Sequence, residues 1–373
     1  MSQVERAWVQ HLRLGGTTPW PEFALGESRW AGETRVPGAQ SLELLRRVNQ
    51  AGAPSAGLVE RLLTTEPRGR GRPPLGLLHP DLQPHASHGP QGAPRVDPGE
   101  LDPRELLRVA TTLIAEDLRD AGTQASPRAR PKRWRPAYRL AGDPWLAAGA
   151  RHALTAAGYP PGGRTPRVLV LADRLDQMVV DCWLARCFGQ GGPPWPSFRS
   201  ALAHGNLPPR ADLGLMVERR VAESGVDRVQ VVLDPASLAG AAGVRRGLAG
   251  VRGEAPRVPH HAAEVARRVA GALGGLVSPD QASVLMRGTL LSRLSRATGP
   301  ATAVGPAHHQ SLREAAVRMT GQVQRTGVAV HGSLDSVIPA EPASVDHEAD
   351  TPAAALTLAI DLLLDPVRRN GEG

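Results

Sequence analysis

Two apolar runs constrain the fold of this chain more than any other feature. They cover residues 168–172 and 229–233, and turn residues bound each of them. Short runs of this kind, with little polar alternation, are typical of strands that are buried on both faces of a parallel sheet. Helical patterns follow both runs, and strands that alternate with helices predict an α/β fold with a mainly parallel sheet flanked by helices.

The rest of the chain is predicted to organise around this core. Residues 1–66 carry helical patterns, and later segments alternate between helices and linkers rich in Pro, Gly or charge. The predicted division is a helical N-terminal region at 1–66, a flexible Pro/Gly/His linker at 67–103, helices with a basic linker at 104–165, the α/β core at 166–339, and an acidic linker with a terminal helix at 340–373.

Helix signals are clearest where a capping residue precedes an apolar pattern. Asp102 and Pro103 stand at the start of a helix over 101–121, where a carboxylate cap and a proline at the first position are both favourable. The other predicted helices cover 3–14, 40–49, 56–65, 145–157, 175–188, 210–224, 260–273, 280–296, 307–326 and 353–364. A short strand over 328–332 is expected to close the core.

A single lysine excludes several classes of chemistry. Lys132 is the chain's only lysine, and it lies in a polar, proline-broken stretch that reads as surface. Phosphate loops of the G-x-x-x-x-G-K-[ST] type, protein kinases and pyridoxal-phosphate enzymes each need a lysine in a defined place. Lys132 fits none of these places, so no cofactor is predicted.

Composition and charge point to an anionic partner or to coding bias. The formal net charge is +8 and the isoelectric point is near 10.8, which favours anionic ligands or nucleic acid. Arginine in place of lysine, with abundant Ala, Gly and Pro, is equally typical of a GC-rich genome. Aromatic residues make up only 3% of the chain, so its core must be built mainly from Leu, Val and Ala.

The cysteines and the termini predict a cytoplasmic protein. Cys182 and Cys187 are too few for a disulfide framework, and we expect them to be buried free thiols in a reducing compartment. The first residues open an amphipathic pattern with no signal peptide, and no apolar run approaches membrane-spanning length.

The turn after the first apolar run is the predicted ligand site, because open α/β sheets bind ligands beyond the carboxyl ends of their strands. Asp173, Arg174 and Asp176 lie in this turn, which contains no glycine. Its carboxylates suit hydroxyl or sugar groups better than phosphate, and Arg174 could hold an anion. The alternative is a capped helix start without a ligand.

Two further loops could rim a cleft beside this turn. One carries Trp195, which we expect to be exposed, and the other carries Arg210 and Asp212 at the start of a helix. Ordinary loops that connect helices, without a ligand, are the simpler explanation of both.

The histidines have no carboxylate or cysteine at a ligand spacing, so no metal site is predicted.

Two basic segments favour nucleic acid. Arg68, Arg70 and Arg72 are interleaved with glycine, a pattern similar to an AT-hook that lies in the minor groove. The second segment combines cations with a tryptophan that could stack on bases, and its residues are Arg130, Lys132, Arg133, Trp134 and Arg135. Chance in an arginine-rich linker is the alternative explanation.

Residues 228–238 and 319–339 resemble segments of uncharacterised actinobacterial sulfotransferase-like proteins, and the resemblance covers roughly residues 166–339. It implies a P-loop-type α/β core that binds a phosphosulfate donor through a Pro-x-Ser-Gly-Thr-Thr loop. Residues 172–177 stand where that loop should be, and they lack its glycines. The resemblance therefore carries over the fold and not the catalytic residues.

Three functions remain open at this point. The first is a degenerate sulfotransferase-like core that binds an anionic or polar small molecule, or a protein partner, without phosphosulfate turnover. The second is an active sulfo- or glycosyl-type transferase with a relocated site at Arg174, Asp176 and Arg210. The third is association with nucleic acid through the arginine-rich linkers. No membrane association is expected.

Overall fold

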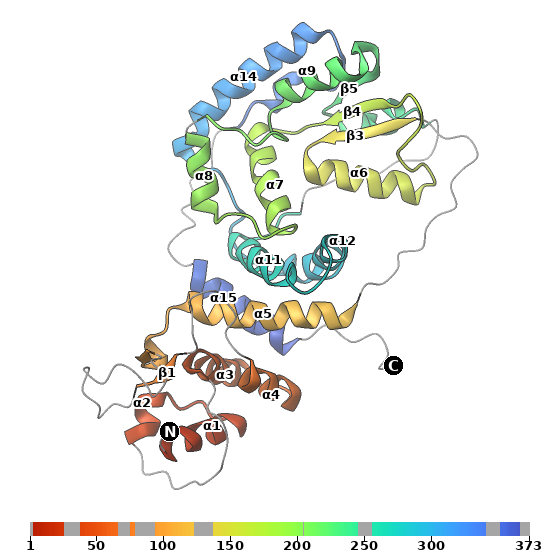
Figure 1. The fold of residues 1–373 in the computed structure, drawn as a ribbon. Coiled ribbons are helices and arrows are strands. Elements are labelled where there is room, and N and C mark those ends of the chain that lie inside the picture. The colour runs from red at the N-terminus through yellow and green to blue at the C-terminus, as the bar shows by residue number, and fades with distance from the viewer. Residues whose placement is uncertain are drawn as a thin grey trace. The chain divides into compact units, whose positions relative to one another are not determined.

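The chain forms two compact units. The computed structural model describes residues 3–25, 38–65, 75–78, 94–122, 137–203, 205–244, 256–340 and 351–365. A helical unit takes residues 1–123, 261–297 and 348–373, and an α/β unit takes residues 124–260 and 298–347 (Figure 1). Each unit therefore draws on segments that are far apart in sequence, whereas the predicted division used contiguous segments.

The helical unit is built from short helices and one small ladder. Its elements are α1 (Gln3–Arg13), α2 (Trp20–Leu25), α3 (Ala39–Ala51), α4 (Ala56–Thr64), β1 (Gly76–Leu77), β2 (Arg95–Val96), the 3-10 turn Pro98–Glu100, α5 (Pro103–Ala121), α11 (His260–Leu273, which begins at the boundary residue), α12 (Pro279–Val284), the π-helical turn Leu285–Leu290, α13 (Leu291–Leu294) and α15 (Thr351–Leu364). The predicted helices of this region are confirmed to within a few residues.

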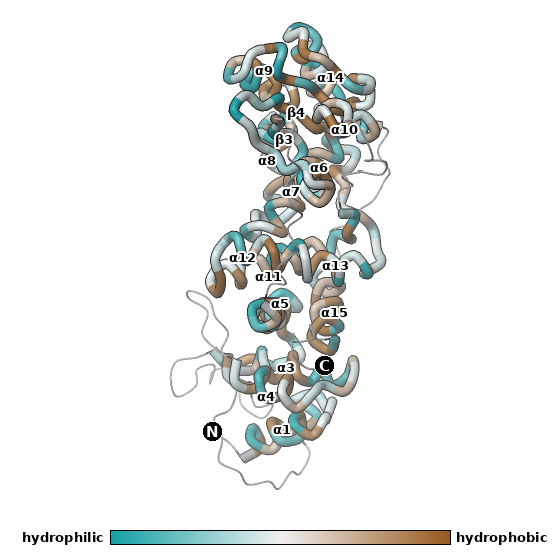
Figure 2. Tube along the Cα trace, turned by 90° about the vertical axis from the view of Figure 1, so that its right-hand side faces the viewer, coloured by the Kyte–Doolittle hydropathy of each residue, from teal (hydrophilic) through white to brown (hydrophobic). Residues whose placement is uncertain are grey.

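Helix α5 begins as the capping signals indicated. Asp102 Oδ1 accepts a hydrogen bond of 2.8 Å from the Arg104 amide, and Pro103 occupies the first helical position. Helix α15 packs against α5 and is apolar over most of its length (Figure 2). Arg293 donates to the Leu362 carbonyl at 2.8 Å, and so satisfies part of the carboxyl end of α15.

Part of the predicted flexible linker is ordered. Strands β1 and β2 pair in parallel within residues 67–103, with Gly76 beside Arg95 and Leu77 beside Val96. The expectation of a wholly flexible segment is wrong for these residues, because two-residue strands leave no detectable sequence period.

The α/β unit contains a four-stranded sheet and its covering helices. Its elements are β3 (Tyr138–Gly142), α6 (Pro144–Ala156), β4 (Arg167–Leu171), α7 (Leu175–Cys187), α8 (Trp195–Ala203), α9 (Leu213–Ser224), β5 (Val229–Val232), α10 (Leu238–Ala241), α14 (His309–Thr326) and β6 (Ala329–His331), with 3-10 turns at Val226–Arg228, Pro235–Ser237, Pro306–His308 and Leu334–Val337.

The sheet is fully parallel, in the order β3-β4-β5-β6. Strands β4 and β5 confirm the predictions from the apolar runs, β6 confirms the short strand expected over 328–332, and the chain has the predicted mixed α/β character. Strand β3 was not predicted, because Arg139 interrupts its apolar character. The strand lies at the edge of the sheet, where this side chain is exposed.

Both faces of the sheet are covered. Leu169, Leu171 and Val232 pack with α6 and α10 in one apolar cluster. Val170 and Val231 alternate with them along the strands and are also fully buried. Helix α9 packs on β4 and β5, and α14 packs on α9. Burial on both faces explains why β4 and β5 read as continuous apolar runs.

Gly142 ends β3 in a conformation that other residues rarely adopt. Its φ is +100°, and a Cβ atom built on it would lie 2.0 Å from the Leu171 carbonyl oxygen. The backbones of β3 and β4 therefore approach each other at a point where only glycine fits.

We expect Gly142→Ala to lower the free energy of unfolding of the α/β unit by at least roughly 2 kcal/mol, because backbone strain of this kind costs about 1–3 kcal/mol and the clash adds to it. Guanidinium denaturation measures the change. Gly240→Ala in α10 is the control, since its Cβ would meet nothing within 4 Å. Equal stability of the two variants would show that the close approach is absent.

Candidate functional site

The candidate site lies at the carboxyl edge of the four-stranded sheet. Asp143 directly follows β3, Asp173 comes two residues after β4, and Asp234 comes two residues after β5. The Asp143 amide donates to the Leu171 carbonyl at 2.8 Å, and the Asp234 amide donates to the His331 carbonyl at 3.2 Å. Strand pairing thus continues into the turns and fixes where these carboxylates lie.

The predicted ligand turn between β4 and α7 is self-contained. Arg174 donates two hydrogen bonds to Asp176, from Nε to Oδ1 at 3.2 Å and from Nη2 to Oδ2 at 2.9 Å. The Arg174 amide donates to Asp173 Oδ1 at 2.7 Å. The structure therefore brings these three predicted residues together, but it leaves the Arg174 charge neutralised by Asp176.

The other predicted residues do not join this turn. Asp212 caps α9 by accepting from the Leu215 amide at 2.9 Å, and Arg210 is exposed just before that helix. Among the described residues, no hydrogen bond or ion pair connects Arg210 or Asp212 with Arg174. The relocated site that joins Arg210 to the turn therefore stays a prediction, without a direct contact between Arg210 and Arg174 in the described part of the chain.

Trp195 belongs to the core of the unit. Only 2% of it is exposed, and its ring lies 5.0 Å from that of Trp183 and 5.7 Å from that of Phe198. The expectation that Trp195 is exposed is wrong. The residue begins α8, a helix that the loop-like composition of residues 189–196 concealed.

Asp143 is a fully buried carboxylate with one satisfied oxygen. Its Oδ1 accepts from the Trp145 and Leu146 amides, both at 2.9 Å, and so caps α6. Its Oδ2 is buried and meets no amide, hydroxyl or guanidinium donor in the described part of the chain. The carboxyl group of Asp181 on α7 is near enough that each of the two carboxyls shifts the pKa of the other. A proton shared between the two carboxyls would satisfy this oxygen.

The raised pKa values favour Asp181 as the holder of that proton. Asp181 is 1% exposed, and its Oδ1 accepts from Gln177 Nε2 at 2.8 Å. Burial first, and then the charge of Asp143, raise the pKa of Asp181 to about 8. Burial raises the pKa of Asp143 to about 6, although the hydrogen bonds from the two capping amides lower it in part. The pair therefore carries one proton near neutral pH, mainly on Asp181, and shares it as coupled groups do.

The neighbouring thiol is inert. Burial first, and then the charges of Asp143 and Asp181, raise the pKa of Cys182 to about 12. A thiol with so high a pKa is a poor nucleophile. Cys182 and Cys187 are both buried and free, which confirms the prediction of buried free thiols.

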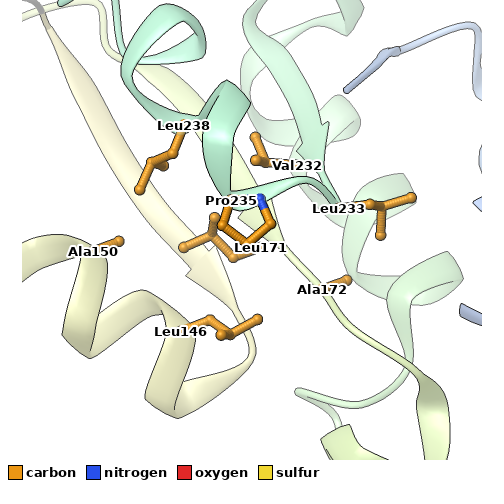
Figure 3. A pocket seen from close by; sticks show the side chains of 8 residues that line it. All are labelled: Leu146, Ala150, Leu171, Ala172, Val232, Leu233, Pro235 and Leu238. Atoms are coloured by element: carbon orange, nitrogen blue, oxygen red, sulfur yellow. The ribbon is translucent and has the colours of Figure 1, made fainter. Parts of the chain in front are cut away.

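A small apolar pocket opens beside the acidic turns. Side chains from α6, from the end of β4 and from the β5–α10 connection surround it (Figure 3). Its lining residues are Leu146, Ala150, Leu171, Ala172, Val232, Leu233, Pro235 and Leu238. Asp173 directly follows the lining residue Ala172, and Asp234 lies between the lining residues Leu233 and Pro235. Ser237 Oγ donates to Asp234 Oδ2 at 2.8 Å.

No group of three or more His, Cys, Asp or Glu side chains among the described residues is arranged to hold a metal ion. His260 instead stacks on Trp183, with ring centroids 5.5 Å apart, and its Nδ1 lies 3.2 Å from the Thr302 hydroxyl oxygen.

The predicted nucleic-acid residues lie outside the described residues, and they are Arg68, Arg70, Arg72, Arg130, Lys132, Arg133, Trp134 and Arg135.

Comparison with known proteins adds no relative. The chain matches no protein-family model, no curated protein and no solved structure. Within the described residues, none of the helices has the length and apolar character that crossing a membrane requires.

Sequence reasoning missed the buried pair. Asp143 stands in a Gly-Asp-Pro-Trp stretch, which is a helix-start signal that could have located the cap. Asp181 lies within a mostly apolar helix. A charged residue among apolar neighbours was therefore a second signal that could have located the pair.

The pair makes stability depend on pH. Each carboxyl has a higher pKa in the folded chain than the ordinary value of 3.8, so the folded state keeps a proton that the unfolded chain releases. This contribution is complete below about pH 4 and is lost as pH rises through about 8. We expect the free energy of unfolding to fall by about 3 kcal/mol between roughly pH 6 and 8.5, mostly through Asp181.

We expect Asp181→Asn to remove most of this fall, because the amide can donate permanently to Asp143 Oδ2. Guanidinium denaturation at several pH values measures it. Asp227→Asn, an exposed carboxylate in the same unit, is the control and should keep the wild-type slope. An Asp181→Asn variant with that same slope would mean that the pair holds no proton.

Proposed function

We propose that the α/β unit is a degenerate sulfotransferase-like core that binds a polar ligand at its carboxyl edge and turns over no phosphosulfate donor. The observation that carries this proposal is the β4–α7 turn. It presents Asp173 and Asp176 where a phosphate-binding loop would present glycine amides, and its one cation is paired with Asp176.

The electrostatics of the edge support the absence of donor turnover. A phosphosulfate donor carries several negative charges and needs amides or free cations to receive them. Asp143 adds a buried negative charge near neutral pH at the edge that also carries the exposed Asp173 and the half-buried Asp234. Charges of one sign gathered at one edge repel an anion.

The same edge suits a neutral, hydroxyl-bearing ligand. Carboxylates accept hydrogen bonds from hydroxyl groups, and the adjacent pocket offers apolar side chains to a ring or alkyl face. Sugars combine both properties. Asp173 and Asp234 are the side chains that we propose receive the hydroxyl groups.

Isothermal titration with adenosine 3′,5′-bisphosphate tests the first half of the proposal. We expect no heat of binding to the full chain, because the turn has neither glycine amides nor a free cation for the phosphates. Binding with a micromolar Kd would overturn the assignment of a degenerate donor site.

Saturation-transfer NMR with a panel of methyl glycosides tests the second half. We expect at least one glycoside to receive saturation, and Asp173→Asn to weaken its binding several-fold because the acceptor charge is lost. Asp227→Asn should leave binding unchanged. A panel without a binder, or equal binding by the two variants, would contradict a hydroxyl-recognising edge.

A further inference from the structure

The amino edge of the same sheet carries exposed arginines. Arg167 is the first residue of β4, and Arg228 immediately precedes β5. The register pairs Val168 with Val229, so Arg167 and Arg228 occupy the same level on neighbouring strands. Adjacent strands lie about 4.8 Å apart, which places two cationic side chains side by side. Both residues are exposed.

Two more exposed arginines stand a few residues before the starts of β4 and β6 in the sequence. Arg164 is exposed three residues before Arg167. The pairing of Gln230 with Ala329 puts Gly327 level with Arg228, and the exposed Arg325 stands two residues before that glycine. We call Arg164, Arg167, Arg228 and Arg325 the arginine row. Within the described residues, none of the four has an ion-pair partner.

The acidic groups nearby do not neutralise the row. Asp227 is exposed beside Arg228, and Glu223 is already engaged by Arg220 at 2.6 Å. Like charges in register on neighbouring strands repel each other. In the described part of the chain, four exposed guanidinium groups with the exposed carboxylate of Asp227 beside one of them are complementary to a polyanion.

We propose that the arginine row binds the phosphate backbone of double-stranded nucleic acid. Guanidinium groups hold phosphate oxygens through two parallel hydrogen bonds, and the spacing of strands repeats them along one edge. Stacking on unpaired bases would need an exposed aromatic ring. Among the described residues, Tyr138 is the aromatic residue in register with Arg167, and it is buried and donates to the Tyr159 carbonyl. The row therefore suits a duplex better than a single strand.

This surface is separate from the proposed ligand site, because the amino and carboxyl ends of parallel strands lie at opposite edges of a sheet. It is also distinct from the arginine-rich linkers considered in the sequence analysis. Recognition through phosphates alone carries no base specificity, so we expect similar affinity for duplexes of different sequence.

The test is fluorescence anisotropy of a labelled duplex of about 20 base pairs with the full chain across a range of salt concentrations. We expect Arg167→Ala/Arg228→Ala to lower affinity about tenfold and to reduce the slope of log K against log salt by about 2, because each neutralised phosphate contributes roughly 0.9. Circular dichroism verifies that the variant is folded.

Arg313→Ala/Arg318→Ala on α14 is the matched control, since it removes two exposed arginines of the same unit. It should change affinity by less than about threefold. Equal losses in the two double variants would overturn the proposal in favour of general charge. No binding of the wild-type chain at about 100 mM salt, tighter binding of a single strand, or capture of polyglutamate in place of the duplex would also overturn it.

Discussion

The close approach of β3 to β4 at Gly142 sets the geometry of the whole carboxyl edge. Because the backbones meet there, the Asp143 amide continues the ladder to the Leu171 carbonyl. With Asp143 held in this place, its Oδ1 accepts hydrogen bonds from the first amides of α6. The second carboxyl of the pair, that of Asp181 on α7, has a raised pKa and favours its protonated form. One glycine thus leads, through a helix cap, to a buried pair of carboxyls.

The parallel sheet gives its two edges opposite chemistry. Aspartates follow β3, β4 and β5, whereas arginines stand at or just before the starts of β4 and β5. Aspartate at the carboxyl edge also serves structure, since it caps the helix or turn that comes next. The acidic edge and the basic edge consequently favour different partners, a neutral hydroxyl-bearing ligand at one and a polyanion at the other.

The sequence predicted those features that depend on burial or on local capping. Continuous apolar runs located β4 and β5, and Asp102 with Pro103 located the start of α5. Features that depend on tertiary contact were out of reach. Nothing in the spacing of Asp143 and Asp181, which are 38 residues apart, shows that they meet. Trp195 was misjudged because part of its burial comes from Trp183 on the preceding helix α7, a tertiary contact that the local sequence does not show.

The most direct test of this account is an NMR titration of the aspartate side-chain carboxyl carbons. The account predicts that two of these resonances titrate as a coupled pair, with midpoints near 6 and near 8. Asp181→Asn should abolish the upper midpoint and return the remaining resonance toward the ordinary range. If every aspartate in the wild-type chain titrates below about pH 5, the buried pair shares no proton and this description of the carboxyl edge is wrong.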